Sequence, residues 1–306
     1  MRHDTAGDPI TGVKWSRRTT RKIAEELAAL GIAVSKNTVG RLLKDMDFKL
    51  RVNRKQIAST KNPDRNQQFL YMGQQRERFA SQGLPIISVD TKKKEQIGNF
   101  KNPGAKWDRD PVLVKDHDFR SDADGMAIPY GIYDTQANRG AVFVGTSHDT
   151  PAFAVDAIAQ WWQQEGCQRY PAARELFILA DGGGSNGPRC RAWKKAIQDT
   201  LCTLGLTVTV SHYPPGASKW NPIEHRLFSQ ISRNWAGEPL TDINKILSFI
   251  RTTKTQTGLT VNAYLIPENY ETGIKISDPE MHQLNLIPHD TLGRWNYTLH
   301  PVQNVN

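Results

Sequence analysis

The sequence predicts a mixed α/β fold for most of the chain, preceded by a short, basic, α-helical region. Beyond Pro85, runs rich in β-branched residues alternate with stretches of helical periodicity, an order typical of a sheet flanked by helices. Residues 1–60 instead hold 13 Lys or Arg and six Asp or Glu, which gives this part +7 of the net charge of +9. Such an uneven charge indicates a polyanionic partner for the basic region.

Length and composition exclude several classes of protein. The chain has 306 residues, 38% of them hydrophobic, with eight Trp, which suits about two globular domains and not a disordered chain. No apolar run reaches the ~18 residues needed to cross a bilayer, and the N-terminus lacks the apolar core of a signal peptide. The three cysteines form no CxxC pair, which favours neither a disulfide framework nor a zinc ribbon. We therefore expect a soluble, cytoplasmic protein without a membrane partner.

The basic region contains two predicted helices. Apolar residues recur at helical spacing over residues 19–30, Gly31 ends the pattern, and Ser35 can cap a second helix. The expected buried residues are Ile23, Leu27, Leu30, Val39, Leu42, Leu43 and Met46. The short connection fits a helix-turn-helix, and an ordinary helical hairpin is the alternative. The free face of the second helix predicts DNA contacts by Lys36, Asn37, Arg41 and Lys44.

Residues 49–65 follow as a basic segment with little apolar content. Six Lys or Arg stand there against Asp64 alone, which is typical of a linker that runs along a polyanion. The DNA contacts expected in this segment are Arg51, Arg54 and Lys55. Asn62-Pro63 then opens a predicted helix that ends near Gly83.

Five strands and three further helices are predicted after that helix. The strands are expected at residues 86–90, 127–133, 140–146, 175–181 and 206–210, and the helices at 151–165, 188–204 and 221–235. A meander followed by strands joined through helical crossovers is the order of a ribonuclease H-like mixed sheet flanked by helices. The first and fourth strands are neighbours in that topology, so the residues at their ends should meet.

Three carboxylates are placed to share one site. Asp90 and Asp181 end the first and fourth strands, and Glu224 lies in the first turn of a helix that Asn221 and Pro222 open. Carboxylates that converge repel one another unless cations neutralise them, and an all-oxygen set selects Mg²⁺ or Mn²⁺. We predict two ions, with Asp90 bridging both and Asp181 and Glu224 each completing one site, for in-line attack on a phosphodiester.

Other features near these carboxylates were weighed against simpler interpretations. Gly182, Gly184 and Gly187 match GxGxxG, but Asp181 directly ahead would repel a pyrophosphate, so a glycine turn is the better alternative to a nucleotide cradle. Asp134 lies in a predicted turn and stays outside the site, and the histidines match no zinc motif. The phosphate contacts expected near the site, with a solvated charge run as the alternative, are Lys92, Lys93, Lys94 and Lys219. Trp220 can stack on DNA or pack in the core.

Several longer motifs make the chain resemble the Rhodopirellula-type DDE transposases of bacterial insertion sequences. They are SVDTKKKE around Asp90, AIPYGIYD, HDT-x-x-FAV from His148, ADGGGSNG around Asp181, PPG-x-SKWN-x-IEHRLF around Glu224, and the late TGL and WNYT segments. The resemblance covers the chain from about Trp15 to Pro301 and places the acidic triad on Asp90, Asp181 and Glu224.

The resemblance implies a metal-dependent enzyme that cuts and joins DNA at the terminal inverted repeats of a mobile element, acting as a homo-oligomer on DNA. It also implies additional residues ahead of this start, so a shortened reading frame is expected. The expected division is 1–60 for the basic region and linker, 61–240 for the catalytic domain, and 241–306 for an extension packed on it. The alternatives are a non-catalytic DNA-binding protein derived from a truncated transposase, and a ribonuclease H-like nuclease without joining activity.

Overall fold

The computed structural model describes residues 5–7, 14–16, 18–48 and 62–302. The chain divides into two compact units, Met1–Ile57 and Ala58–Asn306, which are described separately. Arg51, Arg54 and Lys55, three of the expected DNA contacts, lie outside the described residues. None of the helices in the described ranges is long and apolar enough to cross a membrane.

The first unit contains a short antiparallel pair, β1 (Thr5–Gly7) and β2 (Lys14–Ser16), and the helices α1 (Thr20–Ala29) and α2 (Lys36–Asp45). Ser35 caps α2 as predicted, because its hydroxyl accepts from the Thr38 backbone N–H at 3.1 Å. Gly31 follows α1 with a φ of +83°, a conformation that favours glycine and ends the helix.

The predicted apolar faces of these two helices are only partly buried. Ile23 and Val39 lie in the contact between α1 and α2, with 6% and 3% of their surface exposed. Leu30, Leu42 and Met46 are instead 77%, 46% and 65% exposed, so their predicted burial is wrong. Two short helices share one narrow contact, and residues on its outer side are therefore not covered by the described residues of this unit.

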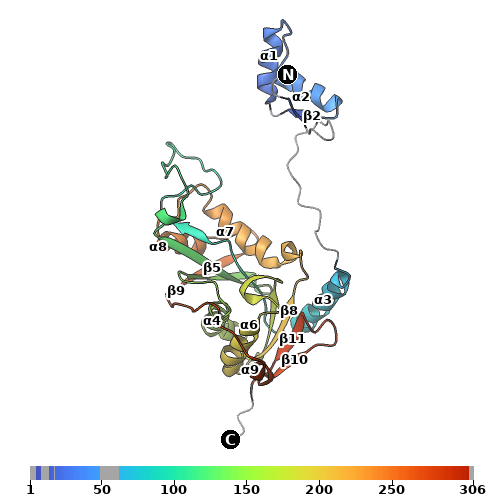
Figure 1. The fold of residues 1–306 in the computed structure, drawn as a ribbon, viewed down its shortest axis with the longest axis vertical. Helices are drawn as coiled ribbons and strands as arrows, with labels where there is room; N and C mark the ends of the chain where they lie inside the picture. The colour runs from blue at the N-terminus through green and yellow to red at the C-terminus, as the bar shows by residue number, and fades with distance from the viewer. Residues whose placement is uncertain (1–4, 8–13, 17, 49–61, 303–306) are drawn as a thin grey trace. The chain divides into compact units, whose positions relative to one another are not determined.

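The second unit is built on a mixed sheet (Figure 1) in which nine strands fall within the described residues. Its strands are β3 (Ile86–Thr91), β4 (Glu95–Ile97), β5 (Gly125–Asp134), β6 (Arg139–Gly145), β7 (Glu175–Ala180), β8 (Thr207–His212), β9 (Thr260–Ile266), β10 (Leu286–Pro288) and β11 (Asn296–Leu299). Their order is β10-β11-β8-β7-β3-β5-β6-β9, with β4 paired to β5.

The centre of the sheet has the predicted topology. β5 is antiparallel to both β3 and β6, which is the expected meander, and β3, β7 and β8 run parallel. The first and fourth predicted strands, β3 and β7, are neighbours in the register Val89↔Ala180. Two residues that directly follow this pair therefore emerge side by side at one edge of the sheet.

Helices cover both faces of the sheet. They are α3 (Arg65–Ser81), α4 (Pro151–Trp161), α5 (Cys167–Arg169), α6 (Arg191–Ala196), α7 (Ser229–Asn234), α8 (Ile243–Arg251) and α9 (Asp278–His282), with π turns at Trp162–Gly166, Ile197–Leu201 and Glu224–Phe228. Alternate residues of β5 and β6 point to opposite faces. Tyr130, Ile132 and Phe143 pack with α4 and α6 in one core, and Tyr133, Val142 and Val144 pack with α7 and α8 in another (Figure 1).

Residues 241–302 extend the sheet at both sides, which the sequence did not predict. β9 runs parallel to β6 at one edge, and β11 pairs antiparallel with β8 toward the other. The buried Tyr297 and Leu299 of β11 belong to the same core as α4 and α6. This segment is therefore an integral part of the sheet of the second unit.

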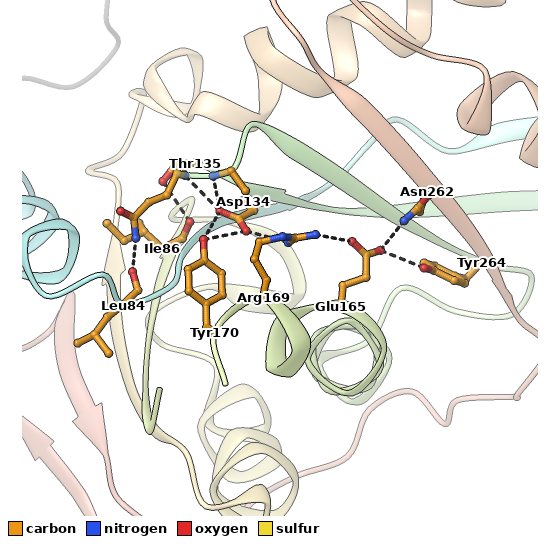
Figure 2. A network of polar contacts seen from close by, with 11 residues as sticks. Leu84, Ile86, Asp134, Thr135, Glu165, Arg169, Tyr170, Asn262 and Tyr264 are labelled. Atoms are coloured by element: carbon orange, nitrogen blue, oxygen red, sulfur yellow. Dashed lines mark hydrogen bonds and ion pairs between the residues drawn. The ribbon is translucent and has the colours of Figure 1, made fainter. Parts of the chain in front are cut away.

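A buried polar network ties the β5–β6 turn to the end of α4 and to β9 (Figure 2). The fully buried Asp134 accepts hydrogen bonds from Arg169 Nη1 and Tyr170 OH, both at 3.0 Å, and from the backbone N–H groups of its own turn. Arg169 also reaches Glu165 at 3.4 Å, and Glu165 in turn accepts from Asn262 and Tyr264 at 3.0 Å. Asp134 thus has a structural role, as its predicted place in a turn suggested.

Candidate active site

Asp90 lies near the end of β3, on the face that carries the helix of Glu224. It is directly opposite Gly131 in the antiparallel pairing with β5. Ile223 and Phe228 pack so closely over Gly131 that a methyl group there would lie 2.9 Å from Ile223 Cδ1. The glycine therefore lets the helix come down onto the sheet beside Asp90. The carboxylate of Asp90 accepts from the Thr91 backbone N–H at 2.8 Å.

Asp181 directly follows β7 and thus emerges next to Asp90. One of its oxygens accepts from the Gly183 backbone N–H at 3.0 Å, which holds the start of the glycine-rich loop. Its backbone carbonyl is 3.0 Å from Nδ1 of the buried His212, and Nε2 of that ring is 3.0 Å from the Tyr297 hydroxyl. Because Trp193 Nε1 donates to the same hydroxyl, the single proton of Tyr297 is left for His212 Nε2, and Nδ1–H donates to Asp181.

Glu224 begins the π turn Glu224–Phe228, in the helix that continues into α7. Asn221 was expected to cap this helix, but its side chain instead binds β3. Its Oδ1 accepts from the Ser88 hydroxyl, its Nδ2 donates to the Val89 carbonyl at 3.4 Å, and the Ile223 N–H donates to Ser88 Oγ at 3.2 Å. These buried contacts anchor the start of the helix two residues from Asp90, so that Glu224 faces the strand end.

Burial and mutual repulsion shape the electrostatics of the three carboxylates. Loss of solvent, then the charge of Asp181 and the neighbouring Glu224 carboxyl, raise the pKa of Asp90 to about 8. Burial also raises the pKa of Asp181. No ion pair among the described residues includes Asp90, Asp181 or Glu224. The site thus lacks a protein cation that would neutralise these acids.

The donor set fits hard divalent cations. All three side chains offer oxygen, and the buried Tyr130 hydroxyl, which has no partner in the described part of the chain, feels the charges of Asp90, Asp149 and Asp181. Within that part, no three His, Cys, Asp or Glu side chains surround one point suitable for an ion. Asp90 interacts electrostatically with both Asp181 and Glu224.

The basic residues predicted near the site separate into buried and exposed ones. Lys92 is 7% exposed, pairs with Glu95 at 2.7 Å and lies 4.4 Å from the centre of the Trp235 ring, so its predicted phosphate contact is wrong. It packs inward because the chain turns after β3. Lys93 and Lys94 are exposed, as is Lys219, which lies over the half-exposed Trp220 ring. On α2, the predicted DNA contacts Lys36, Asn37, Arg41 and Lys44 are all exposed.

Two hollows adjoin the carboxylates on either side. A cavity of about 410 Å³ is lined by Glu224, Lys93, Asn102 and Phe228. Another of about 530 Å³ is lined by Gly182, Gly184, Arg189 and Arg294. Both carry positive side chains beside one of the acids, which suits an anionic chain that passes the strand ends.

Sequence reasoning missed the residues that support the triad. Ser88 and Asp90 alternate on one strand face, which is a signal that Ser88 would point toward the same helix. Asp149 stands in the HDT segment but was not singled out, although it lies close to Asp90 and Asp181. The contact of His212 with Tyr297 joins strands 85 positions apart and has no local signal.

The strand order and the acidic edge define a protein of the nuclease and transposase class. The family described as the Rhodopirellula transposase DDE domain matches residues 1–301, and the chain belongs to this family. A comparison with curated proteins gives no match.

Solved structures similar to this chain include three complexes of Mos1 transposase. The paired-end complex with the left transposon end has a TM-score of 0.45 at 17% identity and covers 76% of this chain and 65% of that one. The mariner paired-end complex with Mn has a TM-score of 0.45 at 16% identity and covers 76% of this chain and 65% of that one. The strand transfer complex has a TM-score of 0.45 at 17% identity and covers 76% of this chain and 64% of that one. The chain thus spans 65% or less of the length of these three Mos1 chains.

Proposed function

We propose that the protein is a DNA transposase that binds the ends of an insertion sequence and catalyses metal-dependent phosphodiester hydrolysis and strand transfer. One observation supports the proposal: Asp90 and Asp181 stand at the ends of neighbouring parallel strands, Glu224 lies in the helix anchored to β3 beside Asp90, and no ion pair among the described residues includes any of the three. Membership of a DDE transposase family supports the same conclusion.

Each acid has a separate role in the proposed chemistry. Asp90 is the central ligand, since it interacts with both other acids, and Glu224 and Asp181 would each hold one ion. Bound Mg²⁺ or Mn²⁺ supplies charge neutralisation for the attacking and the leaving oxygen of the phosphodiester. The Thr91 and Gly183 N–H groups hold Asp90 and Asp181 by one oxygen each. No protein nucleophile is required, because water or a DNA 3′-hydroxyl attacks.

DNA binding is assigned to exposed basic residues in each unit. The exposed side of α2 presents Arg41 and Lys36 near the N-terminal part of the helix, where a major groove can be read. Lys93, Lys94 and Lys219 provide phosphate contacts near the acids. Joining requires that two element ends be held together, so we expect the active form to be a homo-oligomer on DNA.

The proposal is tested with the purified full chain and DNA that carries the inverted repeats flanking its gene. Mg²⁺ or Mn²⁺ should support cutting and joining, and Asp181→Asn or Glu224→Gln should each lower the rate by about 10²-fold or more. Asp199→Asn, which removes an exposed carboxylate that pairs with Lys195 at 2.5 Å, is the matched control and should cut normally. Full activity of either triad variant would overturn the assignment.

Products and binding then separate the alternatives. Cut ends that never join to a second DNA identify a nuclease, and specific end binding without any cutting identifies a non-catalytic DNA-binding protein. Lys36→Ala with Arg41→Ala should weaken end binding by about 10-fold or more without changing the rate at saturating DNA. Unchanged binding would remove α2 from the DNA interface.

A further inference from the structure

A fourth acid, Asp149, lies at the same end of the sheet as the triad. It precedes the N-cap Thr150 of α4 and is only 18% exposed. One of its carboxylate oxygens, Oδ1, accepts hydrogen bonds from Thr91 Oγ1 and from Ser185 Oγ, both at 3.1 Å. Thus a single oxygen joins two segments that are distant in the chain.

These two segments are the ones that carry the catalytic aspartates. Thr91 is adjacent to Asp90 in β3, and Ser185 lies in the loop that begins at Asp181. Between Asp181 and Ser185 stand three glycines, of which Gly184 has a φ of +68°, so this loop has no side chain of its own to fix its path. The Asp149 carboxylate therefore supplies a fixed point for both segments at once.

The hydroxyl of Ser185 has one proton and two neighbours. Its oxygen is also 2.9 Å from Oδ1 of the buried Asn186, whose Nδ2 has no partner among the described residues. Turning the Asn186 amide over lets Nδ2 donate to Ser185 Oγ and leaves the Ser185 proton for Asp149. The Asn186 amide and the Ser185 hydroxyl then each donate a hydrogen bond.

One contact distinguishes Asp149 from the triad. Lys94 Nζ is 3.8 Å from its Oδ2, so Asp149 has a positive neighbour that the other three acids lack among the described ion pairs. Asp149 shares one feature with Asp90 and Asp181, because the charges of all three act on the fully buried Tyr130 hydroxyl. Asp149 thus belongs to the same group of acids but is already balanced by protein.

We propose that Asp149 is a positioning residue, which sets the separation of Asp90 and Asp181 through the hydroxyls of Thr91 and Ser185. The proposal rests on the proposed function, because it concerns the same site. Asp149 acts through Oδ1 as a hydrogen-bond acceptor and not through a direct bond to a metal ion.

The test compares Asp149→Ala, Asp149→Asn and the double variant Thr91→Val with Ser185→Ala in the full chain. Mn²⁺ binding is measured by electron paramagnetic resonance without DNA, and kcat and KM for DNA-end cutting are measured separately. Asp149→Ala should weaken Mn²⁺ binding and lower kcat by about 10- to 100-fold, with KM for DNA unchanged. Asp149→Asn keeps Oδ1 as an acceptor and should restore both, whereas the double variant should resemble Asp149→Ala.

Asp199→Ala is the matched control, since it removes another Asp paired with a Lys, at 2.5 Å, far from the acids in sequence. The positioning role is overturned if Asp149→Ala keeps the Mn²⁺ affinity and the kcat of wild type while Asp90→Ala abolishes both. That result would leave the proposed function intact. An Asp149→Asn variant as weak as Asp149→Ala, beside an active double variant, also overturns the positioning role. If Asp149→Ala does not fold, the double variant and Asp149→Asn decide the matter alone. A wild-type chain that neither binds Mn²⁺ nor cuts DNA overturns the proposed function itself.

Discussion

Replacing Gly131 by alanine should damage the site without touching any acid. An alanine Cβ at this position lies 2.7 Å from Phe228 Cζ and 2.9 Å from Ile223 Cδ1. Carbon atoms in contact prefer about 3.5–4.0 Å, so the helix that carries Glu224 must rise from the sheet by about 1 Å. Phe228 and Ile223 are 3% and 0% exposed, so both side chains are held among buried neighbours.

The size of the effect follows from this displacement. Overpacking a buried contact costs about 1–3 kcal/mol of the free energy of unfolding. A catalytic group misplaced by about 1 Å costs about 10²-fold in rate. We therefore expect Gly131→Ala to unfold at lower urea concentration and to cut DNA ends about 100-fold more slowly under single-turnover conditions.

Two further variants make the result specific. Phe228→Leu shortens the obstructing side chain, so the double variant with Gly131→Ala should recover part of the loss, with a coupling of about 0.5 kcal/mol or more. Gly73→Ala in α3 is the matched control, because no atom lies within 4 Å of its new Cβ, and it should gain up to about 1 kcal/mol. Normal stability and cutting by Gly131→Ala would refute the claim that close approach of the helix sets the Glu224 position.

Two predictions concern stability. Burial lowers the pKa of His212 to about 4, below its ordinary 6.5, so the unfolded chain binds more protons between these values and the contribution of this group to stability falls by about 3 kcal/mol between pH 7 and pH 4. The raised pKa of Asp90 acts in the opposite direction in both proteins, so urea unfolding with EDTA should show the fall in the difference between wild type and His212→Gln, and a difference that does not change with pH would contradict it. Asp134→Ala leaves Arg169 and Tyr170 without their buried acceptor and should lower the free energy of unfolding by about 3–5 kcal/mol, whereas a loss below about 1 kcal/mol would show that the network in Figure 2 is dispensable.

The central strands and the neighbouring positions of Asp90 and Asp181 could be predicted because their signals are local. Ile86–Val89 and Leu176–Ala180 are continuous buried runs that end on Asp90 and Asp181, and the strand order then brings the two ends together. Glu224 was found from its place after Asn221-Pro222, although Asn221 uses its side chain on β3 and not as a cap. Parallel-strand topology thus converts short patterns into a spatial prediction.

What could not be predicted depends on distant partners. β9 pairs with β6 at one edge, and toward the other edge β11 pairs with β8 and β10 pairs with β11; these pairings leave little trace in the composition of the three strands. The Lys92 side chain packs inward because it contacts Glu95 and the Trp235 ring. The basic run in which Lys92 stands does not indicate these contacts. The exposure of Leu42 and Met46 could not be predicted either, because their apolar side chains fit a buried helix face, and the described residues of their unit do not cover that face.

The contact between Tyr297 and His212 joins a late segment of the chain to the neighbourhood of Asp181. The peptide carbonyl of Asp181 is braced by His212, whose orientation is set by a tyrosine 85 positions later. During synthesis on the ribosome, Asp90 and Asp181 are therefore made well before Tyr297. The Tyr297 contact can form only after synthesis has passed β11, and a chain that ends before that strand lacks this support of the Asp181 carbonyl.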